Sequence, residues 1–177
     1  MPTTKIFVRP ASVADRVSIA HICLLTANNG RSAEKKVRHP ELPSQVRALP
    51  YLYLPSGFSF VLVETLVMEK TEIRRVVGYV VGTAHAAQFE REVDTLWWPI
   101  LRAQYSKDLI GTPLDRYFVD HIYKSSKVSA GVRSVGHAHF HVNVVRKYRE
   151  LDCDHLLVDV ALHHLRTQRT QRTMRSI

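Results

Sequence analysis

The chain has 177 residues, of which 45% are hydrophobic and 23% are charged, a composition typical of a globular protein that buries its own core. Its two cysteines, Cys23 and Cys153, exclude a disulfide framework and favour a reducing compartment, so we expect a cytoplasmic protein, with the nucleus as the alternative. No apolar run approaches the ~20 residues of a membrane helix and no signal peptide is visible, so a membrane partner is not expected.

The first expected elements are a strand and a helix. Residues 5–9 alternate as a strand does, and Pro10 closes that strand. Ser12 and Asp15 are typical of a helix N-cap with an acid in the first turn. Gly30 suits a left-handed cap at the end of the helix. The apolar face of this helix is expected to consist of Val13, Val17, Ala20, Leu24 and Ala27.

The middle of the chain reads as a proline-rich segment followed by a hairpin. A short helix is expected over 44–49, and residues 50–54 read as an apolar loop or cover. Residues 58–67 and 74–84 are two strands joined by a charged turn, which predicts an antiparallel hairpin.

The next stretch is expected to be mainly helical and loop-rich. Residues 88–105 have helical character, and Pro99 is expected to kink or restart that helix. Trp97 and Trp98 could line a pocket or could anchor the helix to the core. A short helix is expected over 114–122 within a poorly patterned region.

The last part of the pattern is a strand, a turn and a helix. Residues 137–145 read as the strand, and residues 155–165 are apolar around most of the helix circumference, so this helix should lie buried on a sheet. The sequence therefore predicts a mixed α/β domain in which helices cover a twisted sheet. A turn that leads into a helix N-terminus presents free N–H groups and a positive dipole end, which commonly hold a diphosphate.

The strand and turn resemble a known enzyme superfamily. The run Ala138-His139-Phe140-His141-Val142, leading to Tyr148-Arg149, resembles the Ala-His-Leu-His-Ile … Tyr-Gln run of one branch of the GNAT superfamily of acetyl-CoA-dependent acyltransferases. That branch is similar to the acetyltransferase-like domain attached to the enzyme that removes O-linked N-acetylglucosamine. Other segments agree in order, so that the resemblance spans roughly residues 6 to 165.

The resemblance implies a fold, a coenzyme and a set of binding residues. The implied fold is a GNAT-like acyl-CoA N-acyltransferase fold with a splayed mixed sheet. Acetyl-CoA would sit beside the strand 137–145, and its diphosphate would lie on the turn before the last helix, whose family pattern is Q/R-x-x-G-x-G/A. The implied coenzyme-binding residues are Val142, Val144, Val145, Arg146, Lys147, Arg149, Asp152 and Asp154.

The turn departs from the family pattern in charge. Arg149 fills the first position, but Asp152 and Asp154 stand where the two glycines belong. A carboxylate there repels phosphate, so we expect weakened acetyl-CoA binding. We favour the interpretation that Asp152 caps the last helix itself and occupies the N–H groups that a diphosphate would use.

Three histidines, His137, His139 and His141, share one face of the strand with Asn143. The resemblance implies that this face points toward the acceptor amine, which makes His139 or His141 the candidate general base. The alternative is that they are partly buried strand residues satisfied by hydrogen bonds. These histidines, or His155 with Asp159 and His163, could bind zinc, but solvated contacts are the preferred interpretation and no metal site is predicted.

The chain is expected to divide into a GNAT-like domain over residues 1–165 and a basic low-complexity tail over 166–177. The tail carries an arginine at every third position, which matches no helical face, and solvated disorder is expected there. The family continues after the last helix with further strands, so the domain is expected to be incomplete at its C-terminus. Its exposed sheet edge would permit a homodimer.

Three functional hypotheses follow from the sequence. The first is an N-acetyltransferase that moves acetyl from acetyl-CoA to an unknown amine acceptor. The second is a catalytically silent GNAT-like binding or interaction module with a degenerate cofactor turn. The third is nucleic-acid binding through the tail, suggested by the net charge of +9 but not expected because no aromatic residue lies among the arginines.

Overall fold

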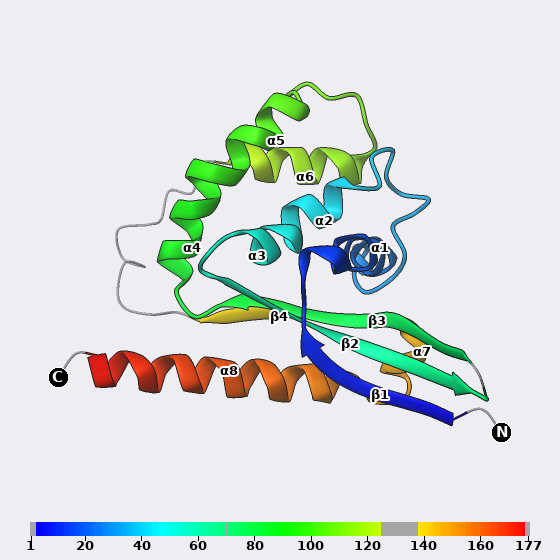
Figure 1. The fold of residues 1–177 in the computed structure, drawn as a ribbon. Helices are drawn as coiled ribbons and strands as arrows, with labels where there is room; N and C mark the ends of the chain where they lie inside the picture. Colours follow the sequence, from blue (N-terminus) through cyan, green and yellow to red (C-terminus); the bar gives the residue numbers. More distant parts are fainter. Residues whose placement is uncertain (1–2, 70, 125–137, 176–177) are drawn as a thin grey trace.

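A computed structural model describes residues 3–69, 71–124 and 138–175, without the side chains of residues 169–175. Its centre is an antiparallel sheet of strand order β1-β2-β3-β4 (Figure 1). The strands are β1 (Thr3–Pro10), β2 (Gly57–Met68), β3 (Thr71–Thr83) and β4 (His139–Val144). The predicted mixed α/β class and the predicted hairpin are confirmed. Every pairing among the described strands is antiparallel, whereas the resemblance implies a mixed sheet.

The β2–β3 hairpin contains a register shift, and it lies beside the first residue of β3 that pairs with β4. The register shifts between Leu62 and Val63, so that Leu62 lies opposite Gly78 and Val63 opposite Val76. Val77 is therefore an extra residue, as in a β-bulge. Its side chain packs toward the last helix, while Tyr79 faces the other side of the sheet.

One face of the sheet is covered by a layer of short helices (Figure 1). The layer consists of η1 (Val13–Asp15), α1 (Arg16–Thr26), α2 (Leu42–Arg47), α3 (Leu49–Tyr53), α4 (Ala86–Glu92), the π-helical turn η2 (Val93–Trp97), α5 (Trp98–Gln104) and α6 (Pro113–Tyr123). Their apolar side chains pack on β2 and β3 in the larger core of the molecule, which includes the fully buried Ile19, Leu42, Val61, Val81, Phe118 and Ile122.

The opposite face of the sheet carries the last helix (Figure 1). The short α7 (Arg146–Arg149) follows β4 directly, and α8 (Asp154–Arg175) then runs back across the sheet. Leu157 and Ala161 of α8 are fully buried in a second core with Leu62 and Val80. This confirms the prediction of a helix lying flat on the sheet. Because α8 has no Gly or Pro to end it, the helix continues through Arg175, where the sequence analysis expected disorder.

Two sequence predictions for the first helix layer need correction. The expected apolar face of α1 is wrong, because Val17 is 69% exposed and the buried side chains are Ile19, Ile22, Cys23 and Thr26. Residues 50–54 were expected as a loop, but most of them form α3. The N-cap at Ser12 and the left-handed Gly30 are confirmed, with a φ of 79° at Gly30.

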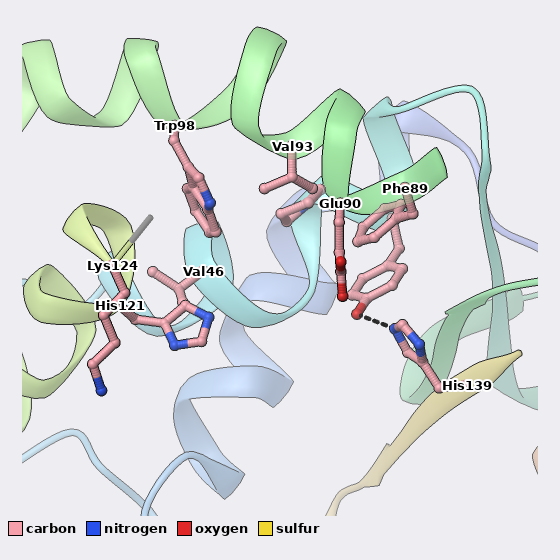
Figure 2. Close-up of a pocket in the computed structure, with 10 residues that line it drawn as sticks. Val46, Phe89, Glu90, Val93, Trp98, His121, Lys124 and His139 are labelled. Carbon is pink, nitrogen blue, oxygen red and sulfur yellow. Dashed lines mark hydrogen bonds between the residues drawn. The ribbon is translucent and has the colours of Figure 1, made fainter. Parts of the chain in front are cut away.

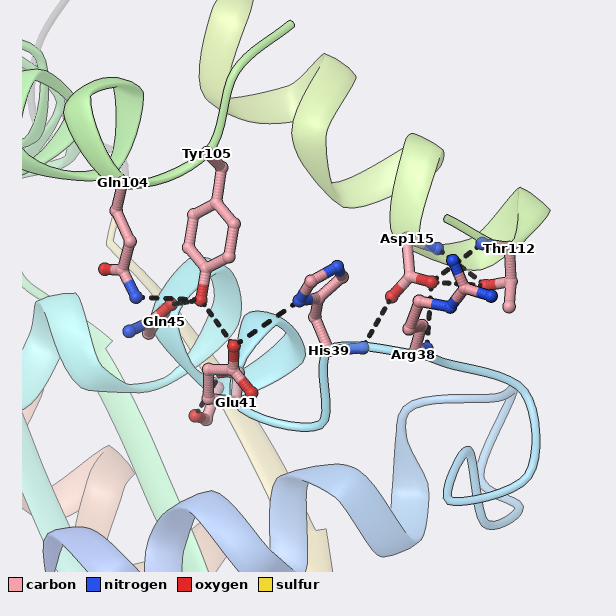
Figure 3. Close-up of polar contacts among 9 residues, drawn as sticks. Arg38, His39, Glu41, Gln45, Gln104, Tyr105, Thr112 and Asp115 are labelled. Atoms are coloured by element: carbon pink, nitrogen blue, oxygen red, sulfur yellow. Dashed lines mark hydrogen bonds and ion pairs between the residues drawn. The ribbon is translucent and has the colours of Figure 1, made fainter. Parts of the chain in front are cut away.

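A buried carboxylate ties the loop before α2 to α6 (Figure 3). The side chain of Asp115 is fully buried and accepts hydrogen bonds from the backbone N–H groups of Arg38, His39 and Thr112 at 2.8–3.2 Å. Burial acts to raise the pKa of Asp115, but these bonds outweigh it and hold the pKa below the ordinary value. Asp115 is therefore ionised, and its carboxylate fixes the start of α6.

A second polar cluster contains the hydroxyl groups of Tyr105 and Tyr123. Tyr105 donates to Glu41 and contacts Gln45, each at 2.8 Å (Figure 3). Tyr123 donates to the backbone carbonyl of Tyr105 at 3.0 Å. Both hydroxyls thus serve the packing of α5 and α6.

Candidate active site

A cavity of about 290 Å³ lies between the helix layer and the start of β4 (Figure 2). Its walls come from α2, α3, α4, η2, α5, α6 and β4, elements that are far apart in the sequence. The lining residues are Val46, Pro50, Tyr51, Phe89, Glu90, Val93, Trp98, His121, Lys124 and His139. Apolar walls with a few polar groups are typical of a small-molecule site.

His139 is the predicted candidate base that lines this cavity. Its Nε2 and the Tyr51 hydroxyl share a hydrogen bond of 2.9 Å (Figure 2). Burial and the neighbouring His141 lower the pKa of His139 below 6.5, so the imidazole is neutral at physiological pH. A neutral imidazole can accept a proton. The hydrogen bond also agrees with the alternative interpretation, because it satisfies one ring nitrogen of a half-buried strand histidine.

Tyr51 holds the His139 ring in place. It stacks on Phe89 with ring centroids 4.2 Å apart and meets the His139 ring edge-on. Burial, with a smaller effect of the Glu90 carboxylate, raises the pKa of Tyr51 to about 12. Its hydroxyl therefore stays protonated and polar in an otherwise apolar wall.

The rest of the predicted histidine face has other surroundings. His141 lies beside Tyr51 and His139 but does not line the cavity, and burial followed by the charge of Arg47 lowers its pKa. Asn143 donates to the hydroxyl of the buried Tyr79 at 3.0 Å. His137 lies outside the described residues. Of this face, only His139 therefore lines the cavity within the described chain.

The two tryptophans have different roles. Trp98 lines the cavity, while Trp97 donates from its indole nitrogen to the carbonyl of Gln45 at 2.8 Å and so anchors the helix. Each of the two sequence interpretations therefore applies to one tryptophan. Glu90, His121 and Lys124 were not predicted as site residues, because no local pattern distinguishes them from other charged helix residues.

The outer edge of β4 carries the backbone groups that the resemblance assigns to the coenzyme. The Val145 N–H donates to the carbonyl of Val77 at 2.9 Å, so this group is already engaged. Hydrogen-bonding direction alternates along an antiparallel strand, and Val142 and Val144 therefore direct their N–H and C=O groups away from β3. Among the described strands, β3 is the sole partner of β4, so this edge has no second strand partner there.

The turn between α7 and α8 contains a residue in the left-handed conformation, and that residue is an aspartate instead of a glycine. Asp152 has a φ of +54°, in the left-handed region that favours glycine. Its N–H donates to Arg149 O and the N–H of Cys153 donates to Tyr148 O, each at 3.0 Å, which is the Schellman pattern of a helix C-terminus. The predicted helix cap is wrong, because within the described chain the Asp152 carboxylate makes no hydrogen bond.

The cations near this turn already have partners. Arg146 pairs with Glu150 at 2.8 Å and Lys147 with Glu64 at 3.6 Å, while the Arg149 guanidinium lies 3.4 Å from the carbonyl oxygen of Gly30. The carboxylates of Asp152 and Asp154 have no ion-pair partner among the residues that the structure describes. The turn before α8 thus carries two carboxylates without an ion-pair partner in the described chain, and its Asp152 and Cys153 N–H groups already donate to backbone carbonyls.

The described residues contain no group of three or more His, Cys, Asp or Glu side chains that could hold a metal ion. None of the described helices is long and apolar enough to cross a membrane.

Comparison with known proteins supports the fold. No family model matches the sequence. The structure is similar to the crystal structure of SsHAT with a TM-score of 0.74 and 24% sequence identity, covering 93% of this chain and 78% of that chain. The chain therefore has a GNAT-like acetyltransferase fold. This likeness supports the superfamily's fold and not the narrower branch that the Ala138–Val142 run resembles.

Proposed function

We propose that the protein is an N-acetyltransferase that transfers acetyl from acetyl-CoA to an amine bound in the cavity beside His139. One observation carries the proposal. A single strand, β4, places a neutral histidine at the cavity and directs the backbone groups of Val142 and Val144 to an edge that has no strand partner among the described residues. An acyl acceptor and an acyl donor must meet at one place, and β4 borders both regions.

The coenzyme would be held by residues on β4 and α7. The backbone groups of Val142 and Val144 would pair with its amides, and Arg146, Lys147 and Arg149 would attract its phosphates. When bound, the coenzyme supplies an activated acyl thioester. Each phosphate–carboxylate contact at ~4 Å would cost about 1 kcal/mol in water and about 4 kcal/mol at an effective dielectric of 20. We therefore expect weak coenzyme binding at the turn with Asp152 and Asp154.

The acceptor side depends on three polar groups at one end of the cavity. The Glu90 carboxylate would attract the ammonium form of the amine. His139 would then take a proton from the nitrogen, which must be neutral to act as a nucleophile. In the tautomer that donates from Nε2 to Tyr51, the His139 Nδ1 has the free lone pair for this step. The apolar walls would keep water away from the reacting amine.

Several finer assignments belong to the same proposal. The run Ala138–Val142 is the basis for placing the protein beside the acetyltransferase-like domain of the O-GlcNAc-removing enzyme. A cytoplasmic location and a homodimer through a sheet edge are proposed on the grounds given by the sequence. The edges of the described sheet are β1 and β4.

A silent binding module is the second candidate, and the unpartnered carboxylates at Asp152 and Asp154 favour it. In that case the cavity would bind its ligand without acyl transfer. The two candidates differ in one measurement, the release of CoA thiol from acetyl-CoA with and without added primary amines at millimolar concentration. Amine-dependent release that is lost in His139→Gln is the expected result. Release that no amine stimulates would overturn the transferase and leave the binding module.

A further inference from the structure

The cavity has charged groups of opposite sign at its two ends (Figure 2). Glu90 lies beside His139 at one end, and His121 and Lys124 lie at the other. Neither the Glu90 carboxylate nor the Lys124 ammonium takes part in an ion pair within the described residues. Opposite charges at the two ends of one cavity, neither of them ion-paired within the described residues, are a recognition pattern for a ligand with complementary charges.

The space between the two ends is apolar and small. The side chains of Val46, Val93 and Trp98 lie between Glu90 and Lys124 (Figure 2). The cavity volume of about 290 Å³ is near the lower limit of about 300 Å³ for small-molecule sites. It therefore suits a small molecule whose middle is a hydrocarbon.

We propose that the acceptor is an ω-amino acid, a small molecule with an amine at one end of an apolar chain and a carboxylate at the other. The amine would lie at Glu90 and His139, and the carboxylate at Lys124. This proposal rests on the proposed function for the fate of the amine, but binding of the ligand stands independently of acyl transfer.

The charges of the cavity disfavour other classes of amine. A diamine would bring its second ammonium to Lys124, and like charges in one site repel. An α-amino acid carries both charges on one carbon, so it cannot reach the two ends at once. A simple alkylamine would leave Lys124 without a partner and would gain nothing from that end of the cavity.

Four probes of similar size separate these possibilities by calorimetry without coenzyme. They are ε-aminocaproate, its isomer norleucine, hexylamine and hexanoate. We expect ε-aminocaproate to bind at least about tenfold more tightly than each of the other three, because it alone satisfies both ends. Equal affinity of ε-aminocaproate and norleucine, or no heat from ε-aminocaproate at millimolar concentration, would overturn the proposal.

Matched variants assign each end of the ligand. Lys124→Gln should weaken the binding of ε-aminocaproate about tenfold and leave the affinity for hexylamine unchanged. Glu90→Gln should weaken the binding of both amines and leave the affinity for hexanoate unchanged. Lys35→Gln and Glu69→Gln remove the same charges from exposed positions outside the cavity and should change nothing. Equal effects of Lys124→Gln and Lys35→Gln would contradict the assignment.

The failure of this proposal can be told apart from failure of the proposed function. If ε-aminocaproate binds in the charge-dependent way described but no CoA thiol is released, the ligand class stands and the transferase reaction is wrong. If thiol release is equally fast with hexylamine and ε-aminocaproate, the transferase stands and the ligand class is wrong.

Discussion

The two regions that flank β4 differ in how their charges are balanced. At the cavity, His139 is hydrogen-bonded to Tyr51 and neutral, so its chemistry suits a general base. At the turn before α8, Asp152 and Asp154 have no partner in the described chain, while the nearby cations are engaged elsewhere. The comparison teaches that two regions beside one strand of a shared fold can have opposite charge balance. Similarity of fold therefore describes the course of the backbone and does not by itself establish the chemistry of a site.

The sharpest test of the cavity side is the loss of its base. His139→Gln should lower acyl transfer by about 100-fold to 10,000-fold, the usual range for a general base. His141→Gln is the matched control, because it removes a neighbouring histidine of the same strand face that does not line the cavity, and it should cost less than about tenfold. The two rates would be measured from the release of CoA thiol. A larger loss for His141→Gln would assign the base to that residue.

The next largest effect should come from the carboxylate that positions the cavity wall. Asp115→Ala leaves three backbone N–H groups without their acceptor: those of Arg38 and His39 in the loop before α2, and that of Thr112 at the start of α6. The α6 helix carries His121 of the cavity wall. The expected loss of unfolding free energy is about 2–3 kcal/mol, measured by urea denaturation. Asp120→Ala, an exposed position on the same helix, should lose less than about 0.5 kcal/mol. Equal losses would show that the Asp115 bonds contribute nothing.

Local sequence rules predicted the frame of the molecule well. The hairpin, the α6 helix, the helix flat on the sheet and the left-handed Gly30 all follow from patterns within a few residues, and the structure confirms them. The burial of α1 was wrong because Val17 and Ile19 are equally apolar, and only packing against β3 decides which one faces the core. The extension of α8 was missed because charge composition, not helix propensity, was given the greater weight.

Only the part of the candidate site that lies on β4 and the turn after it could be predicted from the sequence. His139 and the acidic turn could be found because they lie in one continuous run that resembles a family pattern. Tyr51, Glu90 and Lys124 could not be found, because they come from α3, α4 and the end of α6 and meet only in the folded chain. The left-handed conformation of Asp152 and its place at a helix C-terminus were not predicted, because they depend on backbone angles and hydrogen bonds that appear only in the structure.

The conformation of the turn can be tested separately from its charge. Asp152→Gly and Asp152→Ala remove the same carboxylate, but only glycine adopts a φ of +54° without steric cost. We expect the glycine variant to be more stable than the alanine variant by about 1 kcal/mol in urea denaturation. If the alanine variant is as stable as the glycine variant, the turn does not hold Asp152 in the left-handed region.

The smallest effect concerns the dependence of stability on pH. Burial lowers the pKa values of His121, His139 and His164 in the folded protein below 6.5. The unfolded chain therefore binds protons first as the pH falls, and the unfolding free energy should decrease below about pH 6.5. His139→Gln should make this decrease in unfolding free energy less steep by removing the contribution of the cavity histidine. His164→Gln should do the same by removing the contribution of the α8 histidine. A stability that is constant between about pH 7 and pH 5 would contradict the lowered pKa values of these histidines.

The most direct test of the account is the affinity of acetyl-CoA for the natural chain and for the Asp152→Gly, Asp154→Gly double variant. Calorimetry should show weak binding to the natural chain and at least about tenfold tighter binding to the double variant, because two carboxylates no longer face the phosphates. Asp159→Asn, which removes one exposed charge further along α8, should leave the affinity unchanged. If the double variant binds acetyl-CoA no better than the natural chain, or if neither binds it at millimolar concentration, the coenzyme turn assigned here is contradicted.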